Sequence, residues 1–259
     1  MIAIVTGGSS GIGQALCRLL LQKGATVYCL SRREGPEGCR SIPTDLTNDE
    51  SVAQAFRIIA AECQHVDLLV NNAGMGISGA TELTDLSAAH RLFEVNFFSV
   101  LRTLRPAVPL LSGGGCLIQI SSAAALFAIP YQSLYSASKS ALLSLSLALR
   151  AELEPFGIRV AALLPGDVRT GFTAAREKST AGEERYRGIE KSVARMERDE
   201  QNGLSPETVA HAVWRTFRRK NPKPYAAVGF SYRLLCTLSK FLPARLVSFA
   251  LSRLYCRHI

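Results

Sequence analysis

The sequence has no run of about 18 consecutive uncharged apolar residues, which is the length that a membrane-spanning helix needs. It also has no charged leader, because the apolar residues 2–5 follow the first methionine directly, so we expect no signal peptide. Internal repeats and low-complexity linkers are missing as well. These absences argue against a membrane-spanning protein, and they predict one domain over residues 1–259.

Cysteine and histidine show none of the spacings that are typical of a metal site. The seven cysteines include no Cys-x-x-Cys pair, and the four histidines are scattered along the chain. An odd number of cysteines favours free thiols in a reducing compartment over a disulfide framework. We therefore expect a cytoplasmic protein without a bound metal.

The positive charge of the chain is confined to its C-terminal fifth. The formal net charge is +9, from 30 Lys and Arg against 21 Asp and Glu. Residues 205–259 hold ten of the basic residues and one acid, Glu207, so 20 residues of each sign are left for the rest of the chain. This segment needs an explanation of its own, and we expect no nucleic-acid partner for it.

Short apolar segments alternate with longer helical patterns along most of the chain. This alternation is typical of an α/β protein with a doubly wound parallel sheet, here of about seven strands. The expected strands cover residues 2–6, 25–30, 66–70, 116–120, 158–164 and 225–229. The first expected helix follows the glycine-rich stretch after the first strand and ends at Gly24. The other expected helices cover residues 47–62, 87–111, 134–154 (with Ser133 as the cap) and 208–218.

A glycine-rich turn follows the first expected strand and opens a helix. It reads Thr6-Gly7-Gly8-Ser9-Ser10-Gly11-Ile12-Gly13. Glycines allow the backbone to approach a pyrophosphate closely, and the free N–H groups of a helix N-terminus attract its negative charge. In this strand–turn–helix context the pattern predicts a nucleotide-binding turn.

Tyr135 and Lys139 stand four residues apart and therefore share one face of a helix. A phenol ionises near pKa ~10, too high for a proton shuttle at neutral pH. A lysine ammonium held close stabilises the phenolate and lowers that pKa toward the working range. The pair is compatible with a general acid and base, but taken alone these residues fit an ordinary surface helix better, and only the other motifs favour the catalytic interpretation.

Taken together, these motifs resemble the short-chain dehydrogenase/reductase family, and the resemblance runs from residue 1 to about 170. The gap of thirteen residues between Ser122 and Tyr135 is usual in that family and selects Ser122 over Ser121. The matching elements, in the family's order, are the turn at residues 6–13, Asp45, Asn71-Asn72-Ala73-Gly74, Asn96, Ser122, Tyr135, Lys139, Pro165-Gly166 and Thr170.

The resemblance implies a Rossmann fold and an oxidoreductase that interconverts an alcohol and a ketone. Tyr135 would be the general acid for reduction, Lys139 would lower its pKa and hold the nicotinamide ribose, and Ser122 would hydrogen-bond the substrate oxygen. Asn96 would anchor a water beside Lys139. Asp45 would contact the adenine.

The resemblance also implies where the nicotinamide cofactor binds. The glycine-rich turn would hold the pyrophosphate, and the segment from Pro165 to Thr170 would border the nicotinamide. The cofactor-binding residues expected are Gly7, Ser9, Ser10, Gly11, Ile12, Gly13, Ser31, Arg32, Arg33, Asp45, Leu46, Asn72, Ala73, Gly74, Tyr135, Lys139, Pro165, Gly166, Val168 and Thr170.

The end of the second expected strand predicts NADP(H) rather than NAD(H). A member that prefers NAD would carry an acid near Ser31 to accept hydrogen bonds from the ribose 2′-hydroxyl. Ser31 removes that anion, and Arg32 and Arg33 can pair with a 2′-phosphate. The alternative is that both arginines are solvated loop residues.

Two segments outside the motifs have more than one interpretation. Residues 172–203 are polar and fit either a solvated helical excursion or a lid over the site. Residues 230–259 predict two basic amphipathic helices separated at Pro243. These helices could dock on the body or on a second subunit, touch an anionic membrane, or form the apolar rim of the substrate site, with cations that attract an acidic substrate.

A small hydrophobic substrate is the expected partner. Similar tails in the family point to hydroxysteroids, including bile acids, and the alternatives are retinoids and long-chain or 3-keto-acyl lipid ketones. An NADP-sensing binding protein without turnover is the competing non-enzymatic function, and a carbon–carbon reductase or epimerase is a further one. The helices at 87–111 and 134–154 also fit pairing between copies in a homo-oligomer.

Overall fold

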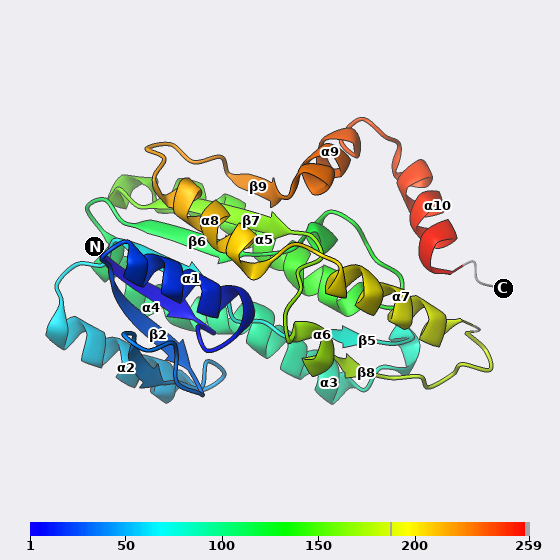
Figure 1. Ribbon diagram of the computed structural model, residues 1–259, viewed down its shortest axis with the longest axis horizontal. Helices are drawn as coiled ribbons and strands as arrows, with labels where there is room; N and C mark the ends of the chain where they lie inside the picture. The colour runs from blue at the N-terminus through cyan, green and yellow to red at the C-terminus, as the bar shows by residue number, and fades with distance from the viewer. Residues whose placement is uncertain (187, 257–259) are drawn as a thin grey trace.

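The computed structural model describes residues 1–186 and 188–256, and it is built on one parallel sheet (Figure 1). The seven strands stand in the order β3-β2-β1-β4-β6-β7-β9, which confirms the predicted doubly wound α/β sheet. They are β1 (Ile2–Thr6), β2 (Thr26–Ser31), β3 (Arg40–Pro43), β4 (Leu68–Asn71), β6 (Cys116–Ile120), β7 (Arg159–Pro165) and β9 (Tyr225–Val228).

Helices cover both faces of this sheet. On one face α1 (Gly11–Gln22) packs beside α8 (Pro206–Phe217), and Leu16, Leu20 and Val213 are buried in that core. On the other face lie α2 (Asp49–Glu62), α4 (Ser99–Leu111) and α5 (Ser133–Glu152), with Phe56 among the core residues. Two apolar layers therefore bury the strands from both sides, as a parallel sheet requires.

The strand order reverses between β1 and β4, which lie side by side in the centre of the sheet. Chain segments that leave neighbouring strands at this point turn to opposite faces and open a crevice at the carboxyl ends of the strands. The glycine-rich turn after β1 and the segment after β4 meet there. The topology thus brings together residues that are far apart in the sequence.

Strand β3 and a second small sheet were not predicted. In β3 only Ile42 is buried, because the strand lies at the sheet edge with Arg40 and Pro43 exposed. In the small parallel sheet, β5 (Ile77–Ser78) pairs with β8 (Glu177–Lys178). Neither segment carries the run of apolar residues by which the other strands are recognised.

The helix predicted over residues 87–111 is divided into three parts. It begins as α3 (Leu86–Phe93), widens into the π-helical segment η2 (Glu94–Phe98) and continues as α4. Asn96 lies in the π-helical segment and is completely buried. π-helical turns are frequent at functional sites, because the widened turn changes the direction of a side chain.

Helix α5 begins one residue earlier than predicted. Ser133 is its first helical residue and does not cap it, because its hydroxyl lies 2.6 Å from that of Thr81. The residue before the helix is Gln132, whose side chain makes no capping hydrogen bond. Helix α2 begins at Asp49, two residues later than predicted, because Asn48 caps it by accepting a hydrogen bond from the backbone N–H of Ser51 at 2.8 Å.

The segment after β7 contains α6 (Phe172–Ala175) and α7 (Ile189–Gln201). Although the sequence suggested little core material here, Ile189 and Val193 of α7 are buried against Ala80 in a small apolar cluster. The movement of this segment as a lid stays a prediction.

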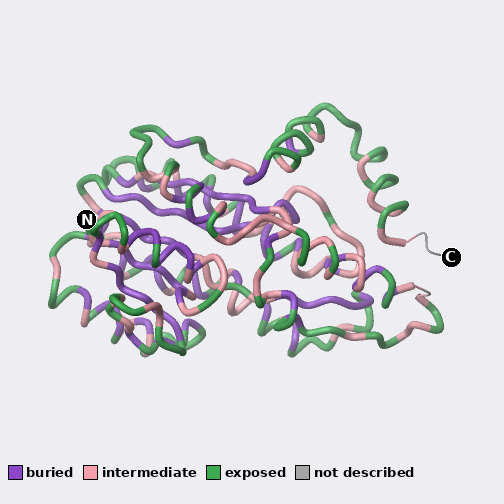
Figure 2. The backbone as a smooth tube through the Cα atoms, in the orientation of Figure 1, coloured by how far each residue is buried: buried purple, intermediate pink, exposed green. Residues whose placement is uncertain are grey.

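Helices α9 (Phe230–Leu238) and α10 (Ala244–Tyr255) form an arm that extends from the end of β9 beyond the main body (Figures 1 and 2). Most residues of the arm are exposed, and Cys236 is its only buried apolar residue within 230–256. Within residues 1–186 and 188–256 no helix is long and apolar enough to cross a membrane.

Candidate active site

A cavity of about 1880 Å³ runs along the carboxyl ends of the strands and continues to the C-terminal arm. This volume exceeds the ~300–1,000 Å³ of a site for one drug-sized ligand. With the exception of Gly13 and Asn96, every residue predicted for catalysis or cofactor binding lines this cavity. The structure therefore brings together in one place what the sequence motifs suggested separately.

The glycine-rich turn has the backbone geometry that only glycine adopts easily. Gly7 and Gly11 have φ values of 65° and 53°. Gly13 does not line the cavity, because it is buried at the start of α1, where a Cβ would overlap the carbonyl oxygen of Gly7 and the side-chain amide of Asn72. Its role is to pack the helix against the turn.

Thr6 and Asn72 join the ends of β1 and β4. The Thr6 hydroxyl accepts hydrogen bonds from the backbone N–H groups of Asn72 at 3.0 Å and Ala73 at 3.2 Å. The Asn72 side chain donates in return to the carbonyl oxygens of Thr6 at 3.0 Å and Gly7 at 3.2 Å. These bonds hold the turn and the segment that leads to Gly74 in a fixed arrangement.

The residues after β2 form the other end of the cavity. Ser31 is buried and its hydroxyl donates to the carbonyl oxygen of Arg33 at 2.6 Å, which shapes the turn, while Arg32 and Arg33 are exposed at the rim. Asp45 accepts hydrogen bonds from the backbone and the hydroxyl of Thr47, and these bonds, more than the nearby Arg32, lower the pKa of its carboxyl. The carboxylate of Asp45 therefore stays charged near Arg32.

Tyr135 lies near the centre of the cavity, with its ring centroid 5.8 Å from that of Phe172. Burial of the phenol raises its pKa to about 12, a hydrogen bond with Ser122 opposes this shift, and the charge of Glu200 raises it further. The net shift is opposite in direction to the one predicted from the Lys139 spacing. In this structure Tyr135 is a firmly protonated acid that is already joined to the Ser122 hydroxyl.

Lys139 is 4% exposed, and its ammonium donates to the carbonyl oxygen of Ile120 at 3.0 Å. Its Nζ lies 5.9 Å from the centroid of the Tyr135 ring. Burial lowers the pKa of Lys139 to about 8, because the charged ammonium loses its contact with water. The ammonium is thus fixed in place between β6 and the phenol.

Asn96 does not line the cavity, and it hydrogen-bonds residues that lie close to Lys139. Its side-chain NH₂ donates to the Met75 carbonyl oxygen and to the Ser138 hydroxyl, each at 3.0 Å, and its oxygen accepts from the Met75 backbone at 2.8 Å. A Cβ on Gly74 would stand 3.3 Å from both the Asn96 oxygen and the Lys139 Nζ. Asn96 therefore ties the π-helical segment to the loop after β4, and its contact with a water stays a prediction.

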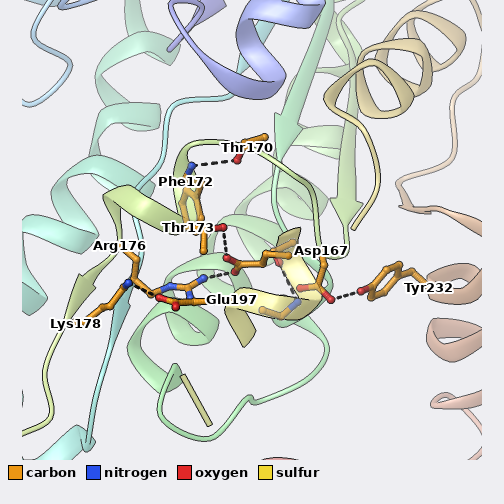
Figure 3. A network of polar contacts seen from close by, with 11 residues as sticks. Asp167, Thr170, Phe172, Thr173, Arg176, Lys178, Glu197 and Tyr232 are labelled. Atoms are coloured by element: carbon orange, nitrogen blue, oxygen red, sulfur yellow. Dashed lines mark hydrogen bonds and ion pairs between the residues drawn. The ribbon is translucent and has the colours of Figure 1, made fainter. Parts of the chain in front are cut away.

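The loop after β7 connects the cavity to the C-terminal arm. A Cβ on Gly166 would overlap the ring of Tyr232, so this ring of α9 lies directly on the glycine. The Tyr232 hydroxyl donates to the carboxylate of the next residue, Asp167 (Figure 3). Burial raises the pKa of both Asp167 and Tyr232. This contact fixes the first turn of the arm beside the loop predicted to border the nicotinamide.

A second polar network in this region was not predicted. Arg176 forms a buried ion pair with Glu200, and the Thr173 hydroxyl donates to the same carboxylate at 2.6 Å. Lys178 and Glu197 form a further ion pair nearby, so α6, β8 and α7 are joined at several points (Figure 3). The partners are 19 to 27 residues apart and follow no local motif, so the sequence gives no signal for them.

The site fits a dinucleotide at one end and a carbonyl compound at the other. Gly7 and Gly11, which have positive φ values, carry no side chain, so the backbone of the turn is open where a pyrophosphate would approach. Arg32 and Arg33 offer cations at the rim beyond it. Ser122 and Tyr135 offer hydroxyl groups that can hold a carbonyl oxygen and protonate it.

Comparison with known proteins agrees with this geometry. The family model described as short chain dehydrogenase matches residues 1–181. A 3-ketodihydrosphingosine reductase from Bacteroides thetaiotaomicron is 37% identical over 262 residues, which cover 98% of this chain and 97% of that protein. The chain thus resembles a curated protein over nearly its full length, with the C-terminal arm included.

Solved structures are similar over the same length. A short-chain dehydrogenase from Streptomyces avermitilis has 29% sequence identity and a TM-score of 0.81, with 96% of this chain and 95% of that chain covered. A short-chain dehydrogenase from Burkholderia cenocepacia, solved in complex with NADP, has 27% identity and a TM-score of 0.75, with coverage of 98% and 96%.

Proposed function

Since this chain belongs to the short-chain dehydrogenase family, we propose that it uses NADPH to reduce the ketone of a long-chain lipid. The observation that carries this proposal is the position of the Ser122–Tyr135 hydroxyl pair. It lies in a cavity that leads from the glycine-rich turn on one side to the apolar C-terminal arm on the other. A lipid ketone would place its carbonyl group at the pair and its chain along the arm.

The nicotinamide supplies the hydride when it is bound, and the residues of the chain hold the carbonyl group and supply the proton. The Ser122 hydroxyl donates a hydrogen bond to the ketone oxygen, where negative charge develops during reduction. The Tyr135 phenol, with its pKa raised to about 12, transfers its proton to that oxygen. The buried Lys139 ammonium stabilises the phenolate that is left behind.

The arm side of the cavity supports a long apolar substrate. Helices α9 and α10 and the turn between them contribute aliphatic side chains to the cavity wall: Leu235, Leu238, Leu242, Leu246, Val247, Ala250, Leu251 and Leu254. An alkyl chain gains about 0.8 kcal/mol for each CH₂ group that leaves water. The similarity to a reductase of 3-ketodihydrosphingosine supports the same substrate class.

Charges around the site favour a neutral or cationic head group over an acidic one. Asp167, Asp199 and Glu200 line the cavity, and both Asp167 and Glu200 raise the pKa of Tyr135. Glu200 is paired with Arg176. Asp167, which accepts a hydrogen bond from a neutral hydroxyl, and the more exposed Asp199 are therefore the carboxylates best able to face an ammonium group. Among residues 230–256 no lysine or arginine lines the cavity. A long-chain amino ketone, whose ammonium group would face these carboxylates, is therefore a better fit than a bile acid or a keto acid.

We expect the purified protein to reduce 3-ketodihydrosphingosine with a kcat/KM at least about tenfold above that for a 3-ketosteroid of similar hydrophobicity. The physical reason is the extended apolar wall, because each additional buried methylene adds about 0.8 kcal/mol to transition-state binding. Oxidation of NADPH, followed at the nicotinamide absorbance, measures both rates. The N-acetylated amino ketone is the matched control, since it keeps the chain and removes the cation.

Equal rates for the amino ketone and its N-acetylated form would show that the carboxylates do not contribute to substrate recognition. A steroid that is turned over faster than every chain-like ketone would contradict the lipid proposal and favour a hydroxysteroid substrate. Neither result would affect the assignment of the chain as an oxidoreductase.

The proposal of NADPH rests on Arg32 and Arg33 at the cavity rim and on the absence of an acid at the end of β2. The related Burkholderia cenocepacia enzyme was solved with NADP, which supports the same cofactor here. We expect replacement of both arginines by serine to weaken NADPH binding about 10- to 100-fold, since a charge-assisted hydrogen bond contributes ~1.5–3 kcal/mol.

NADH binding should change less than about threefold in the same variant, because NADH has no 2′-phosphate to pair with the arginines. Titration of both cofactors by protein fluorescence gives the two affinities. The Arg105→Ser variant is the control, since Arg105 is an exposed arginine of α4 outside the cavity. Tighter binding of NADH than of NADPH by the unmodified protein would refute the proposed preference.

A further inference from the structure

The C-terminal arm exposes large apolar side chains outside the cavity. Phe230, Leu234 and Phe241 are 83%, 51% and 81% exposed, and none of them lines the cavity. We call these three residues the outer apolar face of the arm. Large contiguous apolar surfaces on a folded protein mark a contact with another molecule or with a membrane.

The charges on the arm are all of one sign. Residues 230–256 contain no aspartate or glutamate, and their basic residues are Arg233, Lys240, Arg245 and Arg253, all of them exposed. Arg233 and Lys240 adjoin Leu234 and Phe241 in the sequence, and each also contacts β9, Arg233 by donating to the Ala227 carbonyl oxygen at 3.4 Å and Lys240 through the Tyr225 ring. Arg245 and Arg253 add two further exposed cations on α10. This combination of apolar and basic residues is typical of helices that lie at the surface of an anionic bilayer.

Two neighbouring strips of the arm have different roles. Leu235, Leu238 and Leu242 line the cavity, and they lie next to or one turn from residues of the outer apolar face. Because residues four apart share a helix face, Leu238 of the cavity wall lies beside Leu234 of the outer apolar face. A lipid that leaves a surface in contact with this face would have a short and largely apolar route to the site.

The arm is also held in a defined position on the body. Tyr232 donates to Asp167 and its ring lies on Gly166, as described above. At the far end of α9 the ammonium of Lys240 lies 5.2 Å from the centroid of the Tyr225 ring of β9. A molecule that binds the outer face consequently has a fixed orientation relative to the mouth of the cavity.

We propose that the outer apolar face of α9 and its following turn docks on the surface of an anionic lipid bilayer and places the mouth of the cavity at that surface. The apolar side chains would enter the interface between head groups and acyl chains, and the exposed cations of the arm would pair with lipid phosphates. A second copy of this chain is the weaker candidate, because an isologous contact would bring the same cations of both copies together. The proposal needs no particular substrate, so it can be tested without turnover.

The test uses the full-length protein and vesicles of phosphatidylcholine with or without phosphatidylglycerol, separated by flotation. We expect the protein to float with the phosphatidylglycerol vesicles, and we expect this binding to weaken as salt is added, because the attraction is partly electrostatic. The triple variant Phe230→Ser, Leu234→Ser, Phe241→Ser should bind at least about tenfold more weakly, since burial of a single Phe or Leu side chain is already worth about that factor.

The double variant Leu86→Ser, Phe156→Ser is the matched control. Leu86 and Phe156 are 74% and 53% exposed and lie outside the arm, so their replacement should leave vesicle binding unchanged. Reduction of a short water-soluble ketone should be the same in the triple variant and in the unmodified protein, because the outer face does not line the cavity.

Each of the other outcomes would overturn the proposal. One is that the protein leaves anionic vesicles unbound, and another is that the triple and control variants bind equally well. A third is a dimer in ultracentrifugation that only the triple variant loses while no vesicles bind, which would assign the face to a second copy. Failure of lipid-ketone reduction alone would leave the vesicle result intact and would count only against the proposed function.

Discussion

The Tyr135→Phe variant should reduce a ketone about 10²- to 10⁴-fold more slowly than the unmodified protein, the range that a positioned general acid contributes. Only the hydroxyl is lost, so the ring should keep its contact with Phe172 and the fold should be unaffected. NADPH affinity should change little, because the phenol is one contact among the many residues that line the cavity. The expected result is thus a loss of turnover without a loss of cofactor binding.

Single-turnover reduction at saturating NADPH measures the chemical step, and cofactor fluorescence measures binding. Tyr225→Phe is the matched control, because Tyr225 is a partly buried tyrosine of β9 outside the cavity. An NADP-sensing protein without turnover would bind the cofactor equally well before and after the change and would reduce nothing in either form. Undiminished turnover in the Tyr135→Phe variant would show that Tyr135 is not the general acid.

The raised pKa of Tyr135 sets its protonation state. A phenol with a pKa of about 12 is almost fully protonated at neutral pH, which is the form that ketone reduction needs. Alcohol oxidation needs the phenolate, whose population grows about tenfold for each unit by which the pH rises toward that pKa. The same pKa makes the phenol a weaker acid than a free one, so the nearby Lys139 ammonium has to stabilise the phenolate as the proton leaves.

The central strands of the sheet could be predicted because each is a run of buried apolar residues between turn signals. Strand β3 was missed for the opposite reason, since Ile42 alone is buried in it. The π-helical segment inside the helix predicted at 87–111 could not be recognised either. The hydrophobic pattern continues through it, and the widened turn is held by contacts of Asn96 with residues of distant elements.

The residues predicted for catalysis and cofactor binding could be selected from the sequence because they lie in local motifs, and all but Gly13 and Asn96 line the cavity. The pKa of Tyr135 was not accessible in this way. The helical spacing of Tyr135 and Lys139 suggested a lowered value, but the Lys139 ammonium is directed to the carbonyl oxygen of Ile120. Burial is the main cause of the raised pKa, and Glu200 and Asp167, which raise it further, come from other parts of the fold.

Lys139→Met should make the protein more stable and nearly inactive. Burial lowers the pKa of Lys139 from 10.5 to about 8, a shift that corresponds to roughly 3 kcal/mol of unfavourable energy for the charged form. Loss of the hydrogen bond to Ile120 offsets about 1 kcal/mol of the gain. The remaining gain of about 2 kcal/mol at pH 7 should raise the Tm by roughly 4–8 °C for a domain of this size.

The pH dependence of this gain follows from the sign of the shift. Between a folded pKa of about 8 and an unfolded value of 10.5 the unfolded chain binds more protons at Lys139 than the folded one, so the unmodified protein gains stability as the pH rises through this window. Methionine does not titrate, so the stability advantage of the variant should shrink across the same window and disappear above it.

Thermal unfolding at several pH values, combined with the rate of ketone reduction, measures both effects of this change. Lys220→Met is the matched control, because Lys220 is an exposed lysine near the sheet edge and should leave both Tm and rate unchanged. A Lys139→Met variant that is less stable at pH 7 would show that the ammonium stabilises the fold. If the expected result is obtained, the burial of Lys139 is a cost to the fold that persists because the phenolate of Tyr135 needs a cation beside it during reduction.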